Sequence, residues 1–389
     1  MIRLARITLR EIRLPLVEPF QTSTGVVEER RILLLELADA DGSETWSECV
    51  AETLPTYSPE TVDTCWLALS EWIVPIVLGE PFSASNLVHA TLERRIRGHR
   101  MARATVEMGV WALAASRRGL SLAALLVSES DIARQLGAGP RPFVETGIAL
   151  GMQPSPEALA ERSLAAHAAG YRRIKVKIAP GRDVPYVRAA RDALGPGVSL
   201  TVDANCSYTL DDADHIRVLE TLDTLGLTMI EQPLAHDDLL RHAELQRRLS
   251  TPICLDESIS SDANTEEMLA LGSARMVNLK PGRVGGFQQA LAIHDRCARA
   301  GIPVWCGGML ECGIGRAYNV ALASLPNFTE PGDLSPSSRY WARDVVMQPW
   351  TMDAEGRVRV PLERAGLGVD VDEALVDDLT VRRANFRAR

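Results

Sequence analysis

The sequence predicts an α/β protein in which a modified (β/α) TIM barrel is joined to an α+β capping domain. Three observations predict this fold class. Short apolar strands alternate with amphipathic helices from residue 143 to about residue 330. Seven or eight such units at a steady repeat favour a closed barrel over a doubly wound sheet. The segments before and after this region break the alternation, and strands followed by helices at the N-terminus indicate a separate small domain.

Residues 1–130 are predicted to form the N-terminal part of the capping domain. Two strands, in RITLREIRLPL and RRILLLELADADG, open the chain, and helical spacing follows from Ser58. We expect Ser58 to be the N-cap of the first helix, with Pro59 at the first helical position. Residues 131–340 are assigned to the barrel, and residues 341–389 are expected to return to the capping domain as strands and a loop.

The barrel strands are predicted from eight apolar stretches, each separated from the next by a helical pattern. They are FVETGIAL, RRIKVKI, SLTVDAN, TMIEQP, PICLDES, RMVNLK, PVWCGG and, less clearly, NFTEPGDL. Regular alternation of strand and helix implies parallel strands joined by crossover helices.

The composition excludes several classes of protein. The chain has 389 residues, of which 46% are hydrophobic and 24% charged, as in globular proteins. A net charge of −9 argues against a nucleic-acid surface. The N-terminus lacks the apolar stretch of a signal peptide or membrane span, so we expect a cytoplasmic protein. Seven scattered cysteines without a C-x-x-C pair make a disulfide scaffold or a zinc site a poor interpretation.

Charged residues end five consecutive predicted strands, 24 to 28 residues apart. They are Lys177, Asp203, Glu231, Asp256 and Lys280. Active sites of such barrels lie at the C-terminal ends of the strands, so these side chains should meet. Three converging carboxylates could not all stay ionised without a cation. Oxygen ligands suit Mg²⁺, with Mn²⁺ as a possible substitute, better than zinc, which prefers nitrogen and sulfur ligands.

Lys175 and Lys177 lie two residues apart in RRIKVKI, so both should point to the same side of one strand. An edge strand with a solvated lysine face is the alternative interpretation. If instead they face the acidic centre with Lys280 opposite, they are compensated yet close enough to lower one another's pKa. A lysine tuned toward neutrality is a general base, and a base beside a divalent ion indicates removal of a proton alpha to a carboxylate.

With these residues in place, the sequence resembles the enolase superfamily, and within it the muconate lactonising subgroup, which is marked by K-x-K on the second strand and a lone lysine on the sixth. Eight stretches in order resemble the o-succinylbenzoate synthase / N-succinylamino acid racemase family. They are ECVAETLPTYSPET, IKVKIAPG, VDAN, IEQPL, CLDES, NLKPGRVGG, GGMLECGIGRA and PGDLSPSSRYW.

The resemblance implies a role for each charged residue. Asp203, Glu231 and Asp256 would ligate Mg²⁺, which binds the substrate carboxylate. Lys177 would remove the alpha proton, and Lys175 would support the substrate carboxylate and depress the pKa of Lys177. Lys280 would stabilise the intermediate in the synthase reaction, a syn dehydration of 2-succinyl-6-hydroxy-2,4-cyclohexadiene-1-carboxylate. In racemisation of an N-succinylamino acid, it would exchange a proton on the opposite face.

Further residues are expected to bind substrate or tune the site. Arg283 would lower the pKa of Lys280 and so favour racemisation, unless it simply closes a loop. The other expected residues are Asn205, Glu257, Gly307, Gly308, Met309, Phe20, Ser23 and Tyr57. The loop 19–25 and the segment 52–57 would act as lids. The expected partners are a small carboxylate substrate and further copies of the chain, as a dimer or octamer.

Rival functions are weighed on single residues. The mandelate racemase type needs a histidine base on the seventh strand, and PVWCGG has none. Dipeptide epimerases carry Asp-x-Asp on the eighth strand, where this chain has Glu330 and Asp333. Glu330 could alter acyl specificity or face solvent. A dedicated N-acylamino acid racemase, a muconate cycloisomerase and an inactive barrel kept as a binding protein remain alternatives, and the sequence does not decide between dehydration and racemisation.

Overall fold

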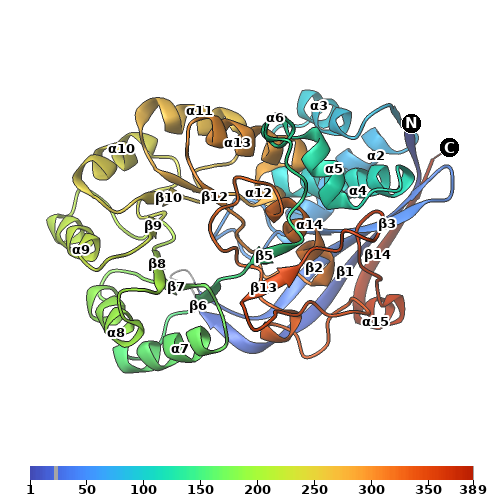
Figure 1. Cartoon of the computed structure of the whole chain (residues 1–389). Helices are drawn as coiled ribbons and strands as arrows, with labels where there is room; N and C mark the ends of the chain where they lie inside the picture. The colour runs from blue at the N-terminus through green and yellow to red at the C-terminus, as the bar shows by residue number, and fades with distance from the viewer. Residues whose placement is uncertain (22–24, 389) are drawn as a thin grey trace.

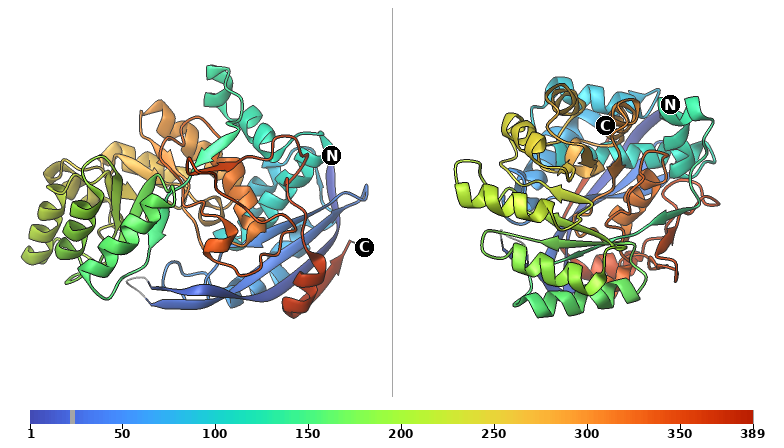
Figure 2. Two further views of the ribbon diagram at one scale, coloured as in Figure 1. Left: turned by 60° about the horizontal axis from the view of Figure 1, so that its bottom comes forward. Right: turned by 60° about the vertical axis from the view of Figure 1, so that its left-hand side comes forward.

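The computed structural model describes residues 1–21 and 25–388 and consists of an antiparallel capping sheet with its helices and a curled parallel sheet surrounded by helices (Figure 1). Figure 2 shows the helices α8 (Val184–Leu194), α9 (Ala213–Asp223) and α10 (Leu239–Arg248) on the side of the barrel remote from the capping sheet. The predicted fold class is confirmed. In the described part of the chain, no helix combines the length and the apolar character needed to cross a bilayer.

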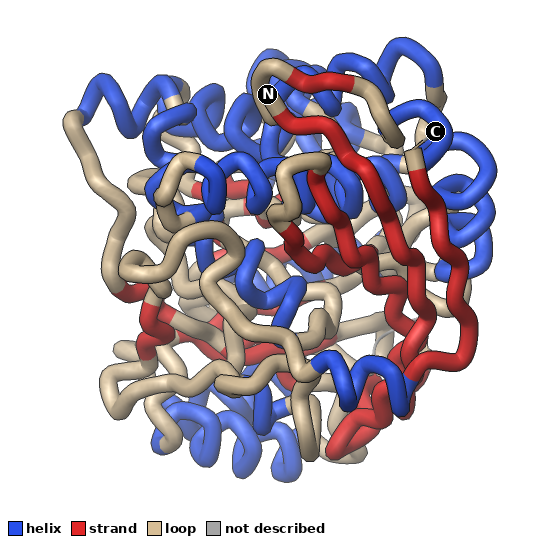
Figure 3. The backbone as a smooth tube through the Cα atoms, turned by 90° about the vertical axis from the view of Figure 1, so that its right-hand side faces the viewer, coloured by secondary structure: helices blue, strands red, loops and turns tan. Residues whose placement is uncertain are grey.

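The capping sheet has the order β14-β1-β2-β3, with β4 pairing with β1 beside this path. Its strands are β1 (Ile2–Gln21), β2 (Val26–Asp39), β3 (Glu44–Cys49), β4 (Pro81–Phe82) and β14 (Thr380–Arg387). The sheet is covered on both faces, which explains the continuous apolar run of β2. Leu33 and Leu35 pack among the capping helices, whereas Ile32 and Leu34 pack toward the barrel. The termini lie near one another at one end of this sheet (Figure 3).

In the described chain, seven helical segments follow the first three strands; the first five cover one face of the sheet, and the last two pack against helices of the barrel. They are α1 (Val62–Ala68), the π-helix η1 (Leu69–Ile73), α2 (Val74–Val77), α3 (Asn86–Arg95), α4 (Arg100–Arg117), α5 (Leu122–Glu129) and α6 (Asp131–Leu136). The expected N-cap is wrong, because α1 begins at Val62 and Thr61 caps it in a capping box with Thr64. Ser58 instead bonds to the backbone of Glu60, whose carboxylate accepts two N–H bonds at the start of α4.

The barrel contains a seven-stranded parallel sheet in the order β12-β11-β10-β9-β8-β7-β6. Its strands are β6 (Ile148–Leu150), β7 (Arg173–Lys177), β8 (Ser199–Asp203), β9 (Met229–Glu231), β10 (Ile253–Leu255), β11 (Met276–Asn278) and β12 (Val304–Trp305). Its helices are α7 (Pro156–Ala168), α8 (Val184–Leu194), α9 (Ala213–Asp223), α10 (Leu239–Arg248), α11 (Asp262–Leu271), α12 (Pro281–Val284), α13 (Phe287–Arg299) and α14 (Gly313–Ala323).

Two predicted barrel strands differ from the structure. The first splits, so that β5 (Phe143–Glu145) pairs with β13 (Arg357–Arg359) and only β6 joins the barrel. The eighth is reduced to isolated bridges, one of Phe328 to β12 and one of Gly332 to Thr146 next to β5. Pro331 explains the interruption, since proline lacks the N–H that a continuous ladder needs. After β13 the chain forms α15 (Glu373–Leu379) before β14.

Two buried glutamates of the capping domain join it to the barrel. Glu107 accepts hydrogen bonds from the backbone N–H groups of Phe287 and Gln288 at 2.8 and 2.9 Å, at the start of α13. Glu48 accepts from Cys312 N and Gly315 N at 3.2 and 2.9 Å, at the start of α14. These carboxylates satisfy N–H groups that a helix leaves unpaired at its N-terminus.

Candidate active site

The register of the parallel strands brings the first three charged strand ends to one level. Lys177 lies opposite Asp203 on β8, and Asp203 lies opposite Glu231 on β9. Asp256 follows β10, and Lys280 follows β11 by two residues. All five side chains are at least nine-tenths buried. The alternative of a solvated lysine face is therefore wrong, because β7 is an inner strand of the sheet between β6 and β8.

Each lysine of β7 contacts carboxylates across the mouth of the barrel. Lys177 Nζ donates to Asp203 Oδ2 and to Asn205 Oδ1, both at 2.6 Å. Lys175 Nζ lies 3.0 Å from Glu231 Oε2 and 2.9 Å from Asp333 Oδ2. The two ammonium groups thus share one acidic cluster, in which Asp203 Oδ2 lies 2.6 Å from Lys177 Nζ and 3.5 Å from Lys175 Nζ.

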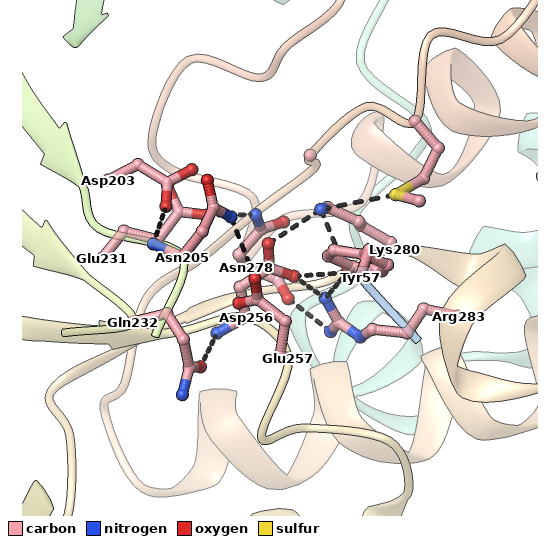
Figure 4. A network of polar contacts seen from close by, with 12 residues as sticks. Tyr57, Asp203, Asn205, Glu231, Gln232, Asp256, Glu257, Asn278, Lys280 and Arg283 are labelled. Carbon is pink, nitrogen blue, oxygen red and sulfur yellow. Dashed lines mark hydrogen bonds and ion pairs between the residues drawn. The ribbon is translucent and has the colours of Figure 1, made fainter. Parts of the chain in front are cut away.

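A second group surrounds Lys280 on the other side of that cluster (Figure 4). Lys280 Nζ donates to Asp256 Oδ2 at 2.8 Å and to the Tyr57 hydroxyl at 3.1 Å, and lies 3.6 Å from Met309 Sδ. Arg283 donates to the other oxygen of Asp256 and to the Tyr57 hydroxyl. The capping-domain segment 52–57 therefore reaches the barrel lysine directly through Tyr57.

The carboxylates do not share one protonation state. Burial, and then the neighbouring Asp203, raises the pKa of Glu231 to about 7. Burial, and then Asp256, raises the pKa of Glu257 to about 8. Burial opposes ionisation of Asp203 and Asp256 too, but the lysines beside them hold the pKa of each below its usual value. Like charges packed this closely are costly unless cations separate them.

The lysine pKa values differ from expectation. Burial lowers the pKa of Lys280 and Arg283 also lowers it, as expected for Arg283, but the surrounding carboxylates, Asp256 first, raise it more in total, and the pKa lies above its usual value. For Lys175, burial is likewise outweighed by carboxylates, Asp333 first, and the pKa is raised. The sequence prediction included an acidic centre facing the lysines but expected the repulsion between cationic groups to prevail, whereas for Lys175 and Lys280 the effect of the carboxylates prevails.

The donor set fits a hard divalent cation. Three strands supply only carboxylate oxygens, and two buried ones, Glu231 Oε2 and Glu257 Oε2, lack a hydrogen-bond donor in the described structure. Lys175 lies near the former without hydrogen-bond geometry. Within residues 1–21 and 25–388, no three acidic, His or Cys side chains surround a common point closely enough to hold a metal. Asp203 and Asp256 instead accept hydrogen bonds from Lys177 and Lys280, respectively.

Strained backbone gathers at this end of the barrel. Five described residues other than glycine have positive φ, and four of them lie just after barrel strands: Asn205, Cys206, Gln232 and Leu310. Gln232 accepts the N–H groups of Asp256 and Ser258 on its side-chain oxygen, so the strained residue braces the loop that carries Asp256. Such strain persists where surrounding contacts overdetermine the conformation, and it commonly marks functional sites.

The remaining expected residues lie at different distances from this cluster. Asn205 bridges Lys177 and Glu257, to which it donates at 2.9 Å. Gly307 adjoins Lys280, since a Cβ there would lie 2.6 Å from Lys280 Cε. A Cβ on Gly308 would instead lie 3.1 Å from Asp333 O.

Phe20 pairs with Val27 near the end of the β1–β2 hairpin, and its side chain has no ring contact with the lysines in the described part of the chain. The neighbouring Gln21 accepts a hydrogen bond from Met152 N just after β6, so the hairpin reaches the barrel mouth. Ser23 lies outside the described residues. Glu330 lines a small cavity of about 20 Å³ with Arg141, Glu145 and six other residues, none of which belongs to the lysine cluster.

Sequence reasoning missed four residues that surround the lysines. Asp333 was noted only as part of an incomplete epimerase motif, yet it contacts Lys175. The other three are Arg173, Trp305 and Asn278, which contact Asp333, Lys175 and Glu231 respectively. Asn278 and Trp305 follow the inward periodicity of their strands, which could have identified them.

One signal in the composition was also missed. The chain contains three lysines, Lys175, Lys177 and Lys280, among 42 basic residues. The other 39 basic residues are all arginines. An arginine stays charged at any physiological pH, whereas a lysine can lose its proton. Lysine occurs in this chain only in this cluster, which supports a chemical role for the amines.

Comparison with known proteins places the chain among enzymes of one architecture. Residues 5–126 match the mandelate racemase / muconate lactonizing enzyme N-terminal domain, and residues 158–375 match the enolase C-terminal domain-like family. The chain is 45% identical over 379 residues to an o-succinylbenzoate synthase from Geobacillus stearothermophilus, covering 97% of this chain and 96% of the relative.

Two further relatives extend this comparison. An N-succinylamino acid racemase from an Amycolatopsis species is 43% identical over 382 residues, covering 98% of each chain. The crystal structure of an enolase-superfamily member from Listeria innocua superposes with a TM-score of 0.92 at 35% identity over the full length of both chains.

Proposed function

The chain belongs to the enolase superfamily, and within it to the o-succinylbenzoate synthase / N-succinylamino acid racemase family, and on this premise we propose that it removes a proton alpha to a carboxylate as an o-succinylbenzoate synthase with racemase activity toward N-succinylamino acids. One observation carries the proposal: Lys177 and Lys280 stand on strands separated by three others, with carboxylates between them.

Asp203, Glu231 and Asp256 would hold Mg²⁺, for which Mn²⁺ could substitute. When bound, the cation supplies positive charge next to the substrate carboxylate and so stabilises the negative charge that develops as the alpha proton leaves. The unpartnered oxygens of Glu231 and Glu257 support this assignment. Lys175 would add a second positive charge from the floor of the site.

Lys177 is proposed as the base. Its ammonium is held by Asp203 and Asn205, and a carboxylate occupied by a cation would release it toward substrate. In the dehydration, the same amine would return the proton to the departing hydroxyl as an acid. The syn geometry of that elimination needs one group on one face of the substrate, which a single lysine provides.

Lys280 is proposed to act from the opposite face. It would stabilise the intermediate by its charge during dehydration and exchange a proton with it during racemisation. Arg283 and the Tyr57 hydroxyl both donate hydrogen bonds to Asp256, and Arg283 also donates to the Tyr57 hydroxyl, so the surroundings of Lys280 are fixed. Their contacts support a second amine held in a fixed position, and relatives of both names share more than 40% identity with the chain. A dedicated N-succinylamino acid racemase is therefore the second candidate function.

The test is a pair of kcat/KM values on one Mg²⁺-loaded sample, for the synthase substrate and for N-succinylphenylalanine, with Lys280→Ala and Arg283→Gln compared with the unmodified chain. We expect both variants to lose racemisation by at least about 100-fold and Arg283→Gln to keep dehydration within about tenfold. Arg296→Gln is the control, because Arg296 pairs with Asp262 outside the site. If neither substrate turns over, the proposed activities are wrong.

A further inference from the structure

Asp333 is a buried carboxylate that contacts both Arg173, inside the barrel, and Lys175, in the candidate active site. Its backbone N–H donates to Cys306 O at 2.8 Å, which fixes it beside β12 in the place of an eighth strand. Its Oδ2 lies 2.9 Å from Lys175 Nζ, and its Oδ1 accepts from Arg173 Nη2 at 2.6 Å. Both oxygens are thus engaged by cations of the chain itself, which argues against a role in binding a substrate ammonium group.

Arg173 fixes Asp333 from below. It precedes Lys175 by two residues on β7, so both point to the same side, and its side chain is fully buried. Trp305 lies against both cations, with its ring centroid 4.0 Å from the Arg173 guanidinium carbon and 4.6 Å from Lys175 Nζ. In the described structure Arg173 Nε and Nη1 have no hydrogen-bond partner, so Asp333 is the only carboxylate bound by this guanidinium.

Lys175 has three carboxylate neighbours that differ in what else they are expected to bind. Glu231 at 3.0 Å and Asp203 at 3.5 Å belong to the proposed metal-binding set. Asp333 lies outside that set. A cation that occupies Glu231 and Asp203 removes their lone pairs from the ammonium group, and an unpaired buried ammonium is costly. Asp333 would then be the carboxylate that remains to hold it.

We propose that Asp333, fixed by Arg173 and Trp305, is a positioning residue that holds the Lys175 ammonium group when Glu231 and Asp203 give up their contacts with it to bind the divalent cation. The proposal deepens the proposed function and rests on its assignment of the metal site. Without Asp333, Lys175 would have Glu231 and Asp203 as its remaining carboxylate partners and would compete with the cation for their oxygens. Metal affinity, not only turnover, therefore depends on this carboxylate.

The experiment measures Mn²⁺ binding by calorimetry without substrate in Asp333→Asn, Lys175→Met and the double variant. We expect Asp333→Asn to weaken Mn²⁺ binding about tenfold or more, as loss of a residue that orients a ligand does. In the Lys175→Met background the same substitution should change Mn²⁺ affinity by less than about twofold, because no ammonium group is left to compete with the cation for the carboxylate oxygens. Equal weakening in both backgrounds would mean that Asp333 acts through its own charge, and would overturn the proposal.

Asp344→Asn is the matched control. Asp344 is another buried carboxylate of the same segment, but it accepts from Gly313 N and contacts Ser337, not the lysines. Its substitution should cost stability without changing Mn²⁺ affinity, and an affinity loss equal to that of Asp333→Asn would contradict the proposal. If Asp333→Asn does not fold, the cycle is run with Asp333→Glu and judged by the same criterion.

A second readout follows Lys175 directly. Lysine labelled with ¹³C at Cε gives three signals from this chain, and Lys175→Met identifies one of them. Asp333→Asn should shift that signal and leave the Lys280 signal near its position, whereas an unmoved Lys175 signal would overturn the proposal. If the unmodified chain binds no Mn²⁺, the proposed function itself fails; if it binds Mn²⁺ but turns over neither substrate, the positioning role can still be tested.

Discussion

The carboxylates at the barrel mouth and those between the capping domain and the barrel are equally buried, yet they have different partners. Asp203 and Asp256 face lysine ammonium groups. Glu48 and Glu107 face backbone N–H groups at the starts of α14 and α13. An ammonium group can move, release a proton or yield its place to a metal, whereas a backbone N–H cannot. The same side-chain chemistry is thus available for reaction in one region and fixed for domain docking in the other.

The largest expected effect is a loss of activity, without a comparable loss of stability, when a residue of the barrel mouth is changed. Lys177→Ala removes the proposed base, so kcat should fall about 10³-fold or more. Asp203 keeps Lys175 as a neighbour at 3.5 Å, so the free energy of unfolding should change by only about 1 kcal/mol. Steady-state kinetics and urea unfolding on the same preparation measure the two effects. Retained turnover would contradict the assignment of Lys177.

The reverse result is expected at the interface between the domains. Glu48→Ala leaves the N–H groups of Cys312 and Gly315 without an acceptor in a buried place, which should cost about 3 kcal/mol of unfolding free energy. The kcat of the folded fraction should change less than tenfold, because Glu48 contacts none of the lysines. A variant of full stability would show that helix α14 is held by other contacts.

The third prediction uses pH to test the interface. Burial raises the pKa of Glu107 to about 7, against an ordinary value of 4.5, and three N–H donors only partly oppose this. Between these values the native state keeps a proton that the unfolded state releases. The stabilising contribution is therefore complete below about pH 4.5 and is lost as pH rises through about 7.

The measurement is urea unfolding at pH 5 and pH 8 for the unmodified chain and for Glu107→Gln, which does not titrate. The stability of the unmodified chain relative to this variant should fall by about 2 kcal/mol over that range. Other buried acids titrate in both proteins and cancel in the difference. A difference that does not change with pH would show that Glu107 is ionised throughout.

The same contrast explains how far the sequence could be interpreted. Strand and helix periodicity predicted the fold class, and equal spacing of charged strand ends brought Lys177, Asp203 and Glu231 to one level. These are properties of a repeating backbone. The pKa of Lys280 was predicted to fall but is raised, and the contact of Asp333 with Lys175 was not predicted, because both depend on which carboxylate pairs with which amine across the barrel. The N-cap was predicted at Ser58 instead of Thr61. The sequence does not show that Glu60, between them, accepts a hydrogen bond from the start of α4 and lies outside α1.

The smallest expected effect tests the barrel mouth without changing any charge. A methyl group on Gly307 would lie 2.2 Å from Asn278 Oδ1 and 2.6 Å from Lys280 Cε, closer than atoms pack. Both neighbours are side chains that can shift, so Gly307→Ala should fold but displace the Lys280 amine. Because racemisation needs Lys280 to transfer a proton and dehydration needs only its charge, racemisation should fall about tenfold and dehydration less.

Gly139→Ala is the control for this variant, since a methyl group there meets no atom within 4 Å. It should leave both activities unchanged. Equal losses of racemisation and dehydration in Gly307→Ala would show that the methyl group disturbs the whole cluster through Asn278, which donates to Glu231 at 2.7 Å. A selective loss of racemisation would instead show that the position of one amine, at constant charge, separates the two reactions on this scaffold.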